Sequence, residues 1–169
     1  MHALIDRNWA APALILAASA TALGFAFAAQ YGFGLAPCVL CLYQRWPFAI
    51  AIVLGALGIA LAASGRSPGW VLALAGLVFT ANAGIAFYHV GVEQHWWRGT
   101  ASCSAVVGQA KTLAELKAQV LAAPLVRCDE VAWSFLGLSM AGWNVLLSGG
   151  LALFSFVAAS WQRRAGIGR

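Results

Sequence analysis

Four stretches of this sequence run for about 18–21 residues without a charged side chain, and no other feature limits the possible folds as strongly. They are residues 10–30, 46–63, 69–88 and 143–161. At about 1.5 Å per residue, a helix of this length crosses the hydrocarbon core of a bilayer. A membrane barrel would instead alternate apolar and polar residues over segments of about 10 residues, and that alternation is absent from the sequence.

These stretches predict an all-α integral membrane protein, in which residues 1–169 form a single four-transmembrane-helix bundle. The two loops at about 31–45 and 89–142 then emerge on the same side of the membrane. The first stretch contains Ala26-Phe27-Ala28, which is similar to a signal-peptidase box. However, its apolar run exceeds the roughly 7–15 residues of a signal-peptide core, so we expect it to remain as a helix.

The composition agrees with a membrane protein and argues against a nucleic-acid partner. Hydrophobic residues make up 62% of the chain and charged residues only 9%, whereas soluble domains carry about 25% charged residues. The formal net charge is +5, but no cluster of basic residues is larger than Arg163-Arg164. We therefore expect the basic residues to set the orientation of the protein in the membrane. They do not form a continuous basic surface of the kind that binds nucleic acid.

If the chain crosses the membrane four times, the arginines of the two terminal segments and of the short turn between the second and third stretches all lie on the same side of the membrane. They are Arg7, Arg66, Arg163, Arg164 and Arg169. Basic residues near membrane spans favour the cytoplasmic side. We therefore expect both termini in the cytoplasm and both loops in the periplasm.

The second loop contains a short segment with helical character. Thr112 and Glu115 have the spacing of a capping box. Leucine and valine then recur at helical spacing, at Leu113, Leu116, Val120 and Leu121. This pattern predicts a short amphipathic helix, either lying on the membrane surface or packed within the loop itself.

All four cysteines fall in the two loops on the predicted periplasmic side. Cys38 and Cys41 form a C-x-x-C in the first loop, and Cys103 and Cys128 lie in the second. Disulfides persist in this compartment, and a C-x-x-C pair can cycle between its two redox states. A zinc site would use Cys103 and Cys128 as its second pair, but zinc ribbons usually repeat the C-x-x-C spacing. Two static disulfides are a further alternative, although so short a ring as Cys38–Cys41 braces little.

Arg45 follows Cys41 by four positions, at the start of the second apolar stretch. On a continuous helix it lies one turn below that sulfur. A cation there can stabilise a thiolate or donate hydrogen bonds to the oxygen of a carbonyl group that is being reduced. A snorkelling arginine at the membrane interface would look the same in the sequence.

Together these motifs resemble the bacterial disulfide bond formation protein B (DsbB) family. The match covers almost the whole chain and rests on Cys38-Val39-Leu40-Cys41-Leu42-Tyr43-Gln44-Arg45, on the two loop cysteines, and on Trp133-Ser134-Phe135-Leu136-Gly137-Leu138. The family consists of four-helix proteins of the bacterial inner membrane. They reoxidise a periplasmic dithiol oxidase, DsbA, and reduce a quinone from the membrane pool, either ubiquinone or menaquinone.

The resemblance implies a catalytic role for each cysteine, and from the cysteine spacing we expect no metal. It implies that Cys103 forms the mixed disulfide with the partner and that Cys128 resolves it. Cys38 then communicates with the loop pair, and Cys41 faces the quinone.

The resemblance also implies two residues that contact the quinone. Arg45 matches the family's quinone-contacting arginine, and His89 resembles a histidine near the same site. Interfacial hydrogen bonding would also explain His89. Gln44 stands where some members of the family carry an acidic residue beside the arginine.

Three other functions are compatible with part of the pattern. A vitamin K epoxide reductase-like protein also combines loop cysteines with a C-x-x-C in four helices, but there the C-x-x-C follows the loop cysteines, and here it precedes them. A non-enzymatic membrane scaffold with braced loops is the second alternative, and a haem or metal carrier that uses His89 and His95 is the third. We expect a quinone-dependent protein-thiol oxidoreductase.

Overall fold

Four long helices dominate the computed structural model, which describes residues 8–100, 103, 112–122 and 126–167. They are α2 (Ala10–Gly32), α4 (Arg45–Ala63), α5 (Gly69–Glu93) and α7 (Met140–Ile167). A short helix, α3 (Val39–Tyr43), leads into α4, so that residues 39–63 form one span. All four spans are long and apolar enough to cross a membrane, which confirms the predicted four-helix membrane bundle.

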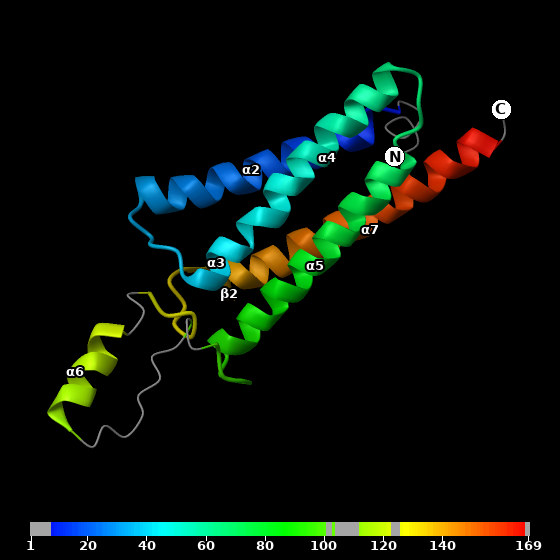
Figure 1. Ribbon diagram of the computed structural model, residues 1–169. Coiled ribbons are helices and arrows are strands. Elements are labelled where there is room, and N and C mark those ends of the chain that lie inside the picture. The colour runs from blue at the N-terminus through cyan, green and yellow to red at the C-terminus, as the bar shows by residue number, and fades with distance from the viewer. Residues whose placement is uncertain (1–7, 101–102, 104–111, 123–125, 168–169) are drawn as a thin grey trace.

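The helices associate in two pairs that meet through α4 and α5. Helix α5 packs most extensively against α7, and α2 packs against α4. By contrast, α2 and α7 have few contacts with each other. Figure 1 shows α2 leaning away from α5 and α7 at the end of the bundle that carries α3. The bundle is therefore loosely closed between α2 and α7 at this end.

Small residues allow both helix pairs to approach closely. A Cβ atom on Gly58 of α4 would lie 2.7 Å from the Pro12 Cβ of α2. A Cβ atom on Gly76 of α5 would lie 2.8 Å from the Phe156 ring of α7. Because lipid tails are as apolar as the helices, such close packing is a main source of helix association in membranes.

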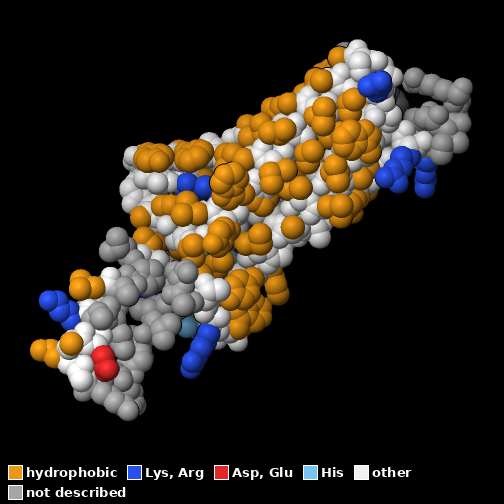
Figure 2. Space-filling view, in the orientation of Figure 1, with side chains coloured by type: hydrophobic (Ala, Val, Ile, Leu, Met, Phe, Trp, Pro, Cys, Tyr) orange, Lys and Arg blue, Asp and Glu red, His pale blue; other side chains and the backbone are white. Residues whose placement is uncertain are grey.

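The exposed surface of the bundle is apolar, as a lipid-facing surface requires. Figure 2 shows hydrophobic side chains covering this face, with most lysine and arginine side chains near the two ends of the molecule. The start of α2 and the end of α7 lie at one end of the bundle, and α3 lies at the other (Figure 1).

Two of the helices extend further into the second loop than the charge-free stretches predicted. Helix α5 continues from residue 88 to Glu93, and α7 begins at Met140, three residues before the predicted stretch. The first loop is also shorter than residues 31–45, because it contains α3 and Arg45 already belongs to α4. The predicted stretch for α5 ended before His89, but His89 and Glu93 are buried in tertiary contacts and α5 continues through them.

The second loop contains an antiparallel hairpin that the sequence analysis did not predict. Strands β1 (Ser134–Phe135) and β2 (Leu138–Ser139) are joined by Leu136 and Gly137, which both have positive φ. Two positive φ angles are required by the tight turn that fits the twist of paired strands. The hairpin leads directly into α7 and is part of the stretch that resembles the DsbB family.

The predicted short helix is present as α6 (Leu113–Ala122). Its capping box is formed, because the Glu115 N–H donates to Thr112 Oγ1 at 3.2 Å and the Thr112 N–H donates to the Glu115 carboxylate at 3.3 Å. The side chains of Leu113 and Leu121 are 83% and 76% exposed. These two leucines are thus not packed within the loop, which favours the membrane-surface alternative.

Candidate functional site

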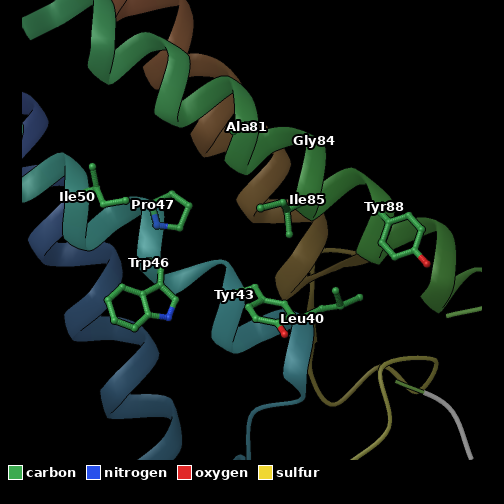
Figure 3. Close-up of a pocket in the computed structure, with 9 residues that line it drawn as sticks. All are labelled: Leu40, Tyr43, Trp46, Pro47, Ile50, Ala81, Gly84, Ile85 and Tyr88. Carbon is green, nitrogen blue, oxygen red and sulfur yellow. The ribbon is translucent and has the colours of Figure 1, made fainter. Parts of the chain in front are cut away.

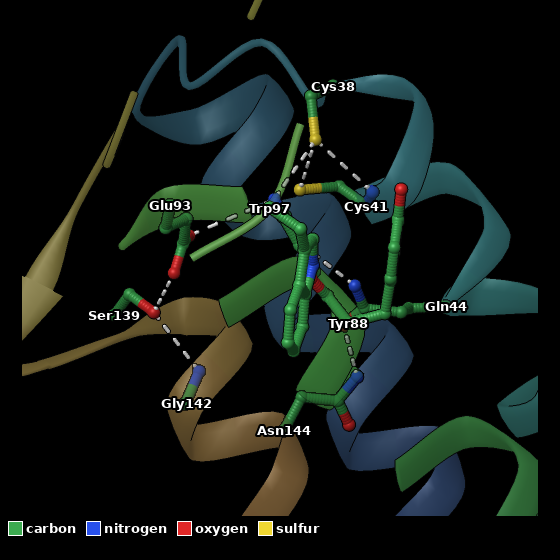
Figure 4. A network of polar contacts seen from close by, with 10 residues as sticks. Cys38, Cys41, Gln44, Tyr88, Glu93, Trp97, Ser139, Gly142 and Asn144 are labelled. Atoms are coloured by element: carbon green, nitrogen blue, oxygen red, sulfur yellow. Dashed lines mark hydrogen bonds and ion pairs between the residues drawn. The ribbon is translucent and has the colours of Figure 1, made fainter. Parts of the chain in front are cut away.

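The C-x-x-C pair forms the first turn of α3. Cys38 caps this helix, because its Sγ accepts a hydrogen bond from the Cys41 N–H at 3.3 Å. The Cys38 thiol also donates to the Cys41 sulfur at 3.1 Å (Figure 4). Both sulfurs are therefore held side by side by the geometry of the helix start.

The two loop cysteines join the C-x-x-C in one buried cluster. Cys103 and Cys128 are fully buried with Cys38, and Leu40 and Val92 complete the cluster. The Cys128 N–H donates to the Cys103 carbonyl at 2.9 Å, and the Cys128 Sγ lies within 4.8 Å of the Cys38 Sγ. The structure therefore brings together all four cysteines that the sequence singled out, with Cys128 in contact with both Cys103 and Cys38.

Cys38 and Cys128, both outside the membrane spans, hold their protons tightly in the dithiol state. The hydrogen bond with Cys41, followed by burial, raises the pKa of the Cys38 thiol to about 12. Burial, followed by the hydrogen bond with Cys103, raises the pKa of the Cys128 thiol well above its usual range. Since the thiolate is the nucleophile in disulfide exchange, this site needs a base next to the sulfurs.

His89 occupies that position. Its Nε2 lies 3.6 Å from the Cys38 Sγ and 3.8 Å from Glu93 Oε1, and its ring is buried. The other carboxylate oxygen of Glu93 accepts a hydrogen bond from Ser139 Oγ at 2.5 Å. His89 thus connects the cysteine cluster to a buried carboxylate at the end of α5. Figure 4 shows the Ser139 side chain directed at that carboxylate.

A chain of amide side chains supports the opposite edge of the histidine ring. His89 Nδ1 and Gln44 Nε2 are 2.9 Å apart. Asn144 Nδ2 donates to Gln44 Oε1 at 2.6 Å, and Asn144 Oδ1 accepts from Ser148 Oγ at 2.9 Å. Asn82 completes the chain by donating to Ser148 Oγ at 2.9 Å. Gln44, whose role the sequence left open, therefore holds His89 in place.

Sequence analysis missed Glu93, Ser139 and Asn144 as members of this site. Glu93 was placed in a loop, and Asn144 was included in an apolar stretch. The available signal was that Asn82 and Asn144 are carboxamides inside predicted spans, where polar groups usually bond to other helices.

A cavity of about 870 Å³ lies between α2 and α7, where these two helices barely touch. Most of its lining is apolar and aromatic, and its polar lining residues include Cys41, Gln44, Arg45, His89 and Asn144. Cofactor sites are typically apolar clefts with a few converging polar groups. This cavity therefore offers an apolar ring access to the Cys41 sulfur.

Arg45 lines this cavity, and its guanidinium is bound to α2. Gln44 separates α3 from α4, so Cys41 and Arg45 do not lie on one regular helix. The Arg45 guanidinium donates to Gln30 Oε1 at 2.7 Å and lies 5.0 Å from the centre of the Phe27 ring, both on α2. Among the described residues, no hydrogen bond joins Arg45 to Cys41.

A second hollow, of about 620 Å³, lies between α3–α4 and α5 (Figure 3). It is lined by aliphatic and aromatic residues such as Tyr43, Trp46 and Tyr88, and it contains neither a cysteine nor a charged side chain. It therefore lacks the groups that thiol or electron-transfer chemistry requires.

Comparison with known proteins identifies relatives of the whole membrane domain. Residues 8–158 match the profile of the family described as "Disulfide bond formation protein DsbB". The chain is 32% identical over 155 residues to a disulfide bond formation protein B of Xanthomonas axonopodis, covering 89% of each chain. It is 31% identical over 145 residues to disulfide bond formation protein B 2 of Pseudomonas syringae, covering 80% of this chain and 79% of the relative. No solved structure matches the chain.

Proposed function

Since the chain belongs to the disulfide bond formation protein DsbB family, we propose that it reoxidises a DsbA-like thiol oxidase and passes the electrons to a membrane quinone. Membership of the family makes the chain a multi-pass membrane oxidoreductase of disulfide formation. The observation that carries this proposal is the row of sulfurs from Cys103 through Cys128 and Cys38 to Cys41, in which the first three are buried and Cys41 lines the cavity. The family match also decides against the vitamin K epoxide reductase-like alternative.

The proposed electron transfer begins on the loop pair. A partner thiolate attacks the Cys103–Cys128 disulfide at Cys103, and the partner's second thiolate then releases an oxidised partner and two loop thiols. Cys103 is fully buried here, so partner docking has to uncover its sulfur.

The loop thiols then reduce the C-x-x-C disulfide in two exchange steps. The Cys128 thiolate attacks Cys38 because these sulfurs are neighbours, forming a Cys38–Cys128 disulfide and releasing the Cys41 thiolate. The Cys103 thiolate attacks Cys128 next, which restores the loop disulfide and releases Cys38. The net result is that two electrons have moved from the loop pair to Cys38 and Cys41.

The residues around the cavity fit a quinone. Its apolar lining suits a ring with an isoprenoid tail, and Arg45 and Gln44 supply hydrogen-bond donors for carbonyl oxygens. A bound quinone supplies an acceptor for two electrons and two protons. In this site Cys41 is the thiol that lines the cavity, and His89 is placed to take the proton of Cys38 when the C-x-x-C disulfide closes again.

Anaerobic mixing tests this function. Purified protein is combined with a reduced DsbA-like partner and excess quinone, and quinone absorbance and partner thiols are followed together. One quinone should be reduced for every partner disulfide formed, with ubiquinone and menaquinone compared in parallel. A non-enzymatic scaffold would leave both signals unchanged, and partner oxidation without quinone reduction would show that another acceptor is used.

We further propose that the protein lies in the bacterial inner membrane with both termini in the cytoplasm and the cysteines in the periplasm. The start of α2 and the end of α7 lie at the end of the bundle opposite α3. Arg66 lies in the turn between α4 and α5, and Arg163 and Arg164 lie near the end of α7, so these arginines favour the cytoplasm for that end. A cytoplasm-dependent reporter fused after Arg169 should be active, and a periplasm-dependent reporter inactive. The opposite result would reverse the assigned orientation.

A further inference from the structure

Three potential metal ligands converge at the inner end of the cysteine cluster. The Cys38 Sγ, the His89 Nε2 and the Cys128 Sγ all lie within 4.8 Å of one another, and all three side chains are buried. They come from three separate segments, namely the start of α3, the last turns of α5 and the loop before the hairpin. Disulfide exchange needs a base beside one of the sulfurs, but it does not by itself require the imidazole nitrogen to lie within 4.8 Å of both.

The spacing suits a tetrahedral metal ion of the zinc type. Zinc bonds to thiolate sulfur at about 2.3 Å and to imidazole nitrogen at about 2.0–2.1 Å, so sulfur and nitrogen ligands of one ion are about 3.6 Å apart. The Cys38 Sγ and the His89 Nε2 are 3.6 Å apart in this structure. Two sulfurs and one imidazole also form the soft donor set that favours zinc over magnesium or calcium.

We propose that the dithiol form of this protein binds one Zn²⁺ through Cys38, His89 and Cys128, and that the metal-bound form is blocked in disulfide exchange. On binding, the Cys38 and Cys128 thiols each lose a proton, and both protons are released. No electron moves, because zinc is redox-inert. A Cys38–Cys41 or Cys103–Cys128 disulfide removes at least one of the thiolates, so metal binding and the oxidised state exclude each other.

The surroundings of His89 supply the remaining parts of a zinc site. Glu93 Oε1, at 3.8 Å from the His89 Nε2, is the nearest carboxylate and a candidate for the fourth ligand. A ligating histidine usually donates its other ring N–H to an acceptor. Gln44 is the residue at His89 Nδ1, and with its amide turned to present the oxygen it becomes that acceptor. The Asn144 amide, which now donates to Gln44 Oε1, would turn with it.

Zinc binding can be measured on the purified full-length protein, without partner or quinone, so the result does not depend on the electron acceptor. The reduced protein, freed of reductant under anaerobic conditions, competes with a chromophoric chelator for Zn²⁺. We expect one zinc per reduced chain and none in the oxidised chain. Cys128→Ala and His89→Ala should each weaken binding by more than the roughly 100-fold that loss of an outer-shell partner can cost.

Cys103→Ala is the matched control, because it removes the neighbouring buried thiol and leaves the three ligands intact. It should bind zinc within a few-fold of the unaltered protein. Gln44→Glu places a permanent acceptor at His89 Nδ1 and should tighten binding by roughly 10-fold, whereas Gln44→Leu should weaken it by a similar factor.

Several outcomes would overturn the proposal. Equal loss in Cys103→Ala and Cys128→Ala would mean that zinc is held by the loop thiols in general. Unchanged binding in His89→Ala, or binding to the oxidised protein, would mean adventitious binding only. If an alanine variant does not fold, Co²⁺ bound to the unaltered reduced protein decides. Tetrahedral bands with thiolate-to-metal charge transfer would support the site, and an octahedral spectrum would refute it.

Discussion

Cys128→Ala is expected to stop turnover and to leave Cys103 able to trap the partner oxidase, if Cys128 is the resolving cysteine. The variant, with Cys38–Cys41 oxidised, is mixed with a partner whose single remaining cysteine carries a thionitrobenzoate leaving group. The Cys103 thiolate displaces that group and forms a stable mixed disulfide. Released thionitrobenzoate measures the rate by absorbance, and peptide mapping identifies the linked cysteine.

Cys103→Ala is the matched control for this experiment. It leaves Cys128 as the free loop thiol, in contact with Cys38 at the inner side of the cluster. Turnover should also be lost, but the mixed disulfide should form far more slowly. If Cys103→Ala traps the partner as fast as Cys128→Ala does, the partner-facing role belongs to Cys128, and the proposed order of the sulfurs is wrong.

Arg45→Ala should raise the apparent KM for quinone by roughly 10- to 150-fold, because losing a charge-assisted hydrogen bond costs about 1.5–3 kcal/mol. Arg45→Lys should raise it less, since lysine keeps the cation and loses the planar fork. Exchange between the partner and the loop cysteines should be almost unchanged, because Arg45 contacts α2 and not the cluster. Steady-state kinetics at saturating reduced partner and varied quinone provide the measurement.

The structure adds a control that separates quinone binding from a purely structural role of Arg45. The guanidinium joins α4 to α2 through Gln30 and the Ala26 carbonyl, so removing it also loosens one wall of the cavity. Gln30→Ala removes the main part of this link and leaves the guanidinium in place. If Gln30→Ala raises the quinone KM as much as Arg45→Ala does, Arg45 acts only by positioning α2.

The sequence by itself determined the architecture, because membrane insertion depends on properties that are local in the chain. A bilayer span needs a long apolar run, and each of the four runs became a helix of the bundle. The capping box of α6 is equally local, since Thr112 and Glu115 are three residues apart, and it formed as predicted. The cysteine pattern, through the family resemblance, also pointed to disulfide formation, which the family match confirmed.

The position of Arg45 shows where local reasoning failed. The spacing of four residues placed it beneath Cys41 on a regular helix, but the helix is interrupted at Gln44. The guanidinium is therefore turned to α2, where a carboxamide and a carbonyl accept its hydrogen bonds. The spacing argument did not take account of Pro47, which has no N–H to donate to the Tyr43 carbonyl and whose ring crowds that carbonyl, so the regular helix is interrupted just before it.

Only the tertiary structure decided which residues surround the sulfurs. His89 and Glu93 lie on one face of α5, Asn144 and Ser148 on α7, and the hairpin brings Ser139 against Glu93. No spacing in the sequence relates these segments, because their meeting depends on the rotation and crossing of the helices about their axes. Buried polar groups must find hydrogen-bond partners, and in an apolar bundle those partners lie on other helices, so packing selects the partners and thereby assembles the site.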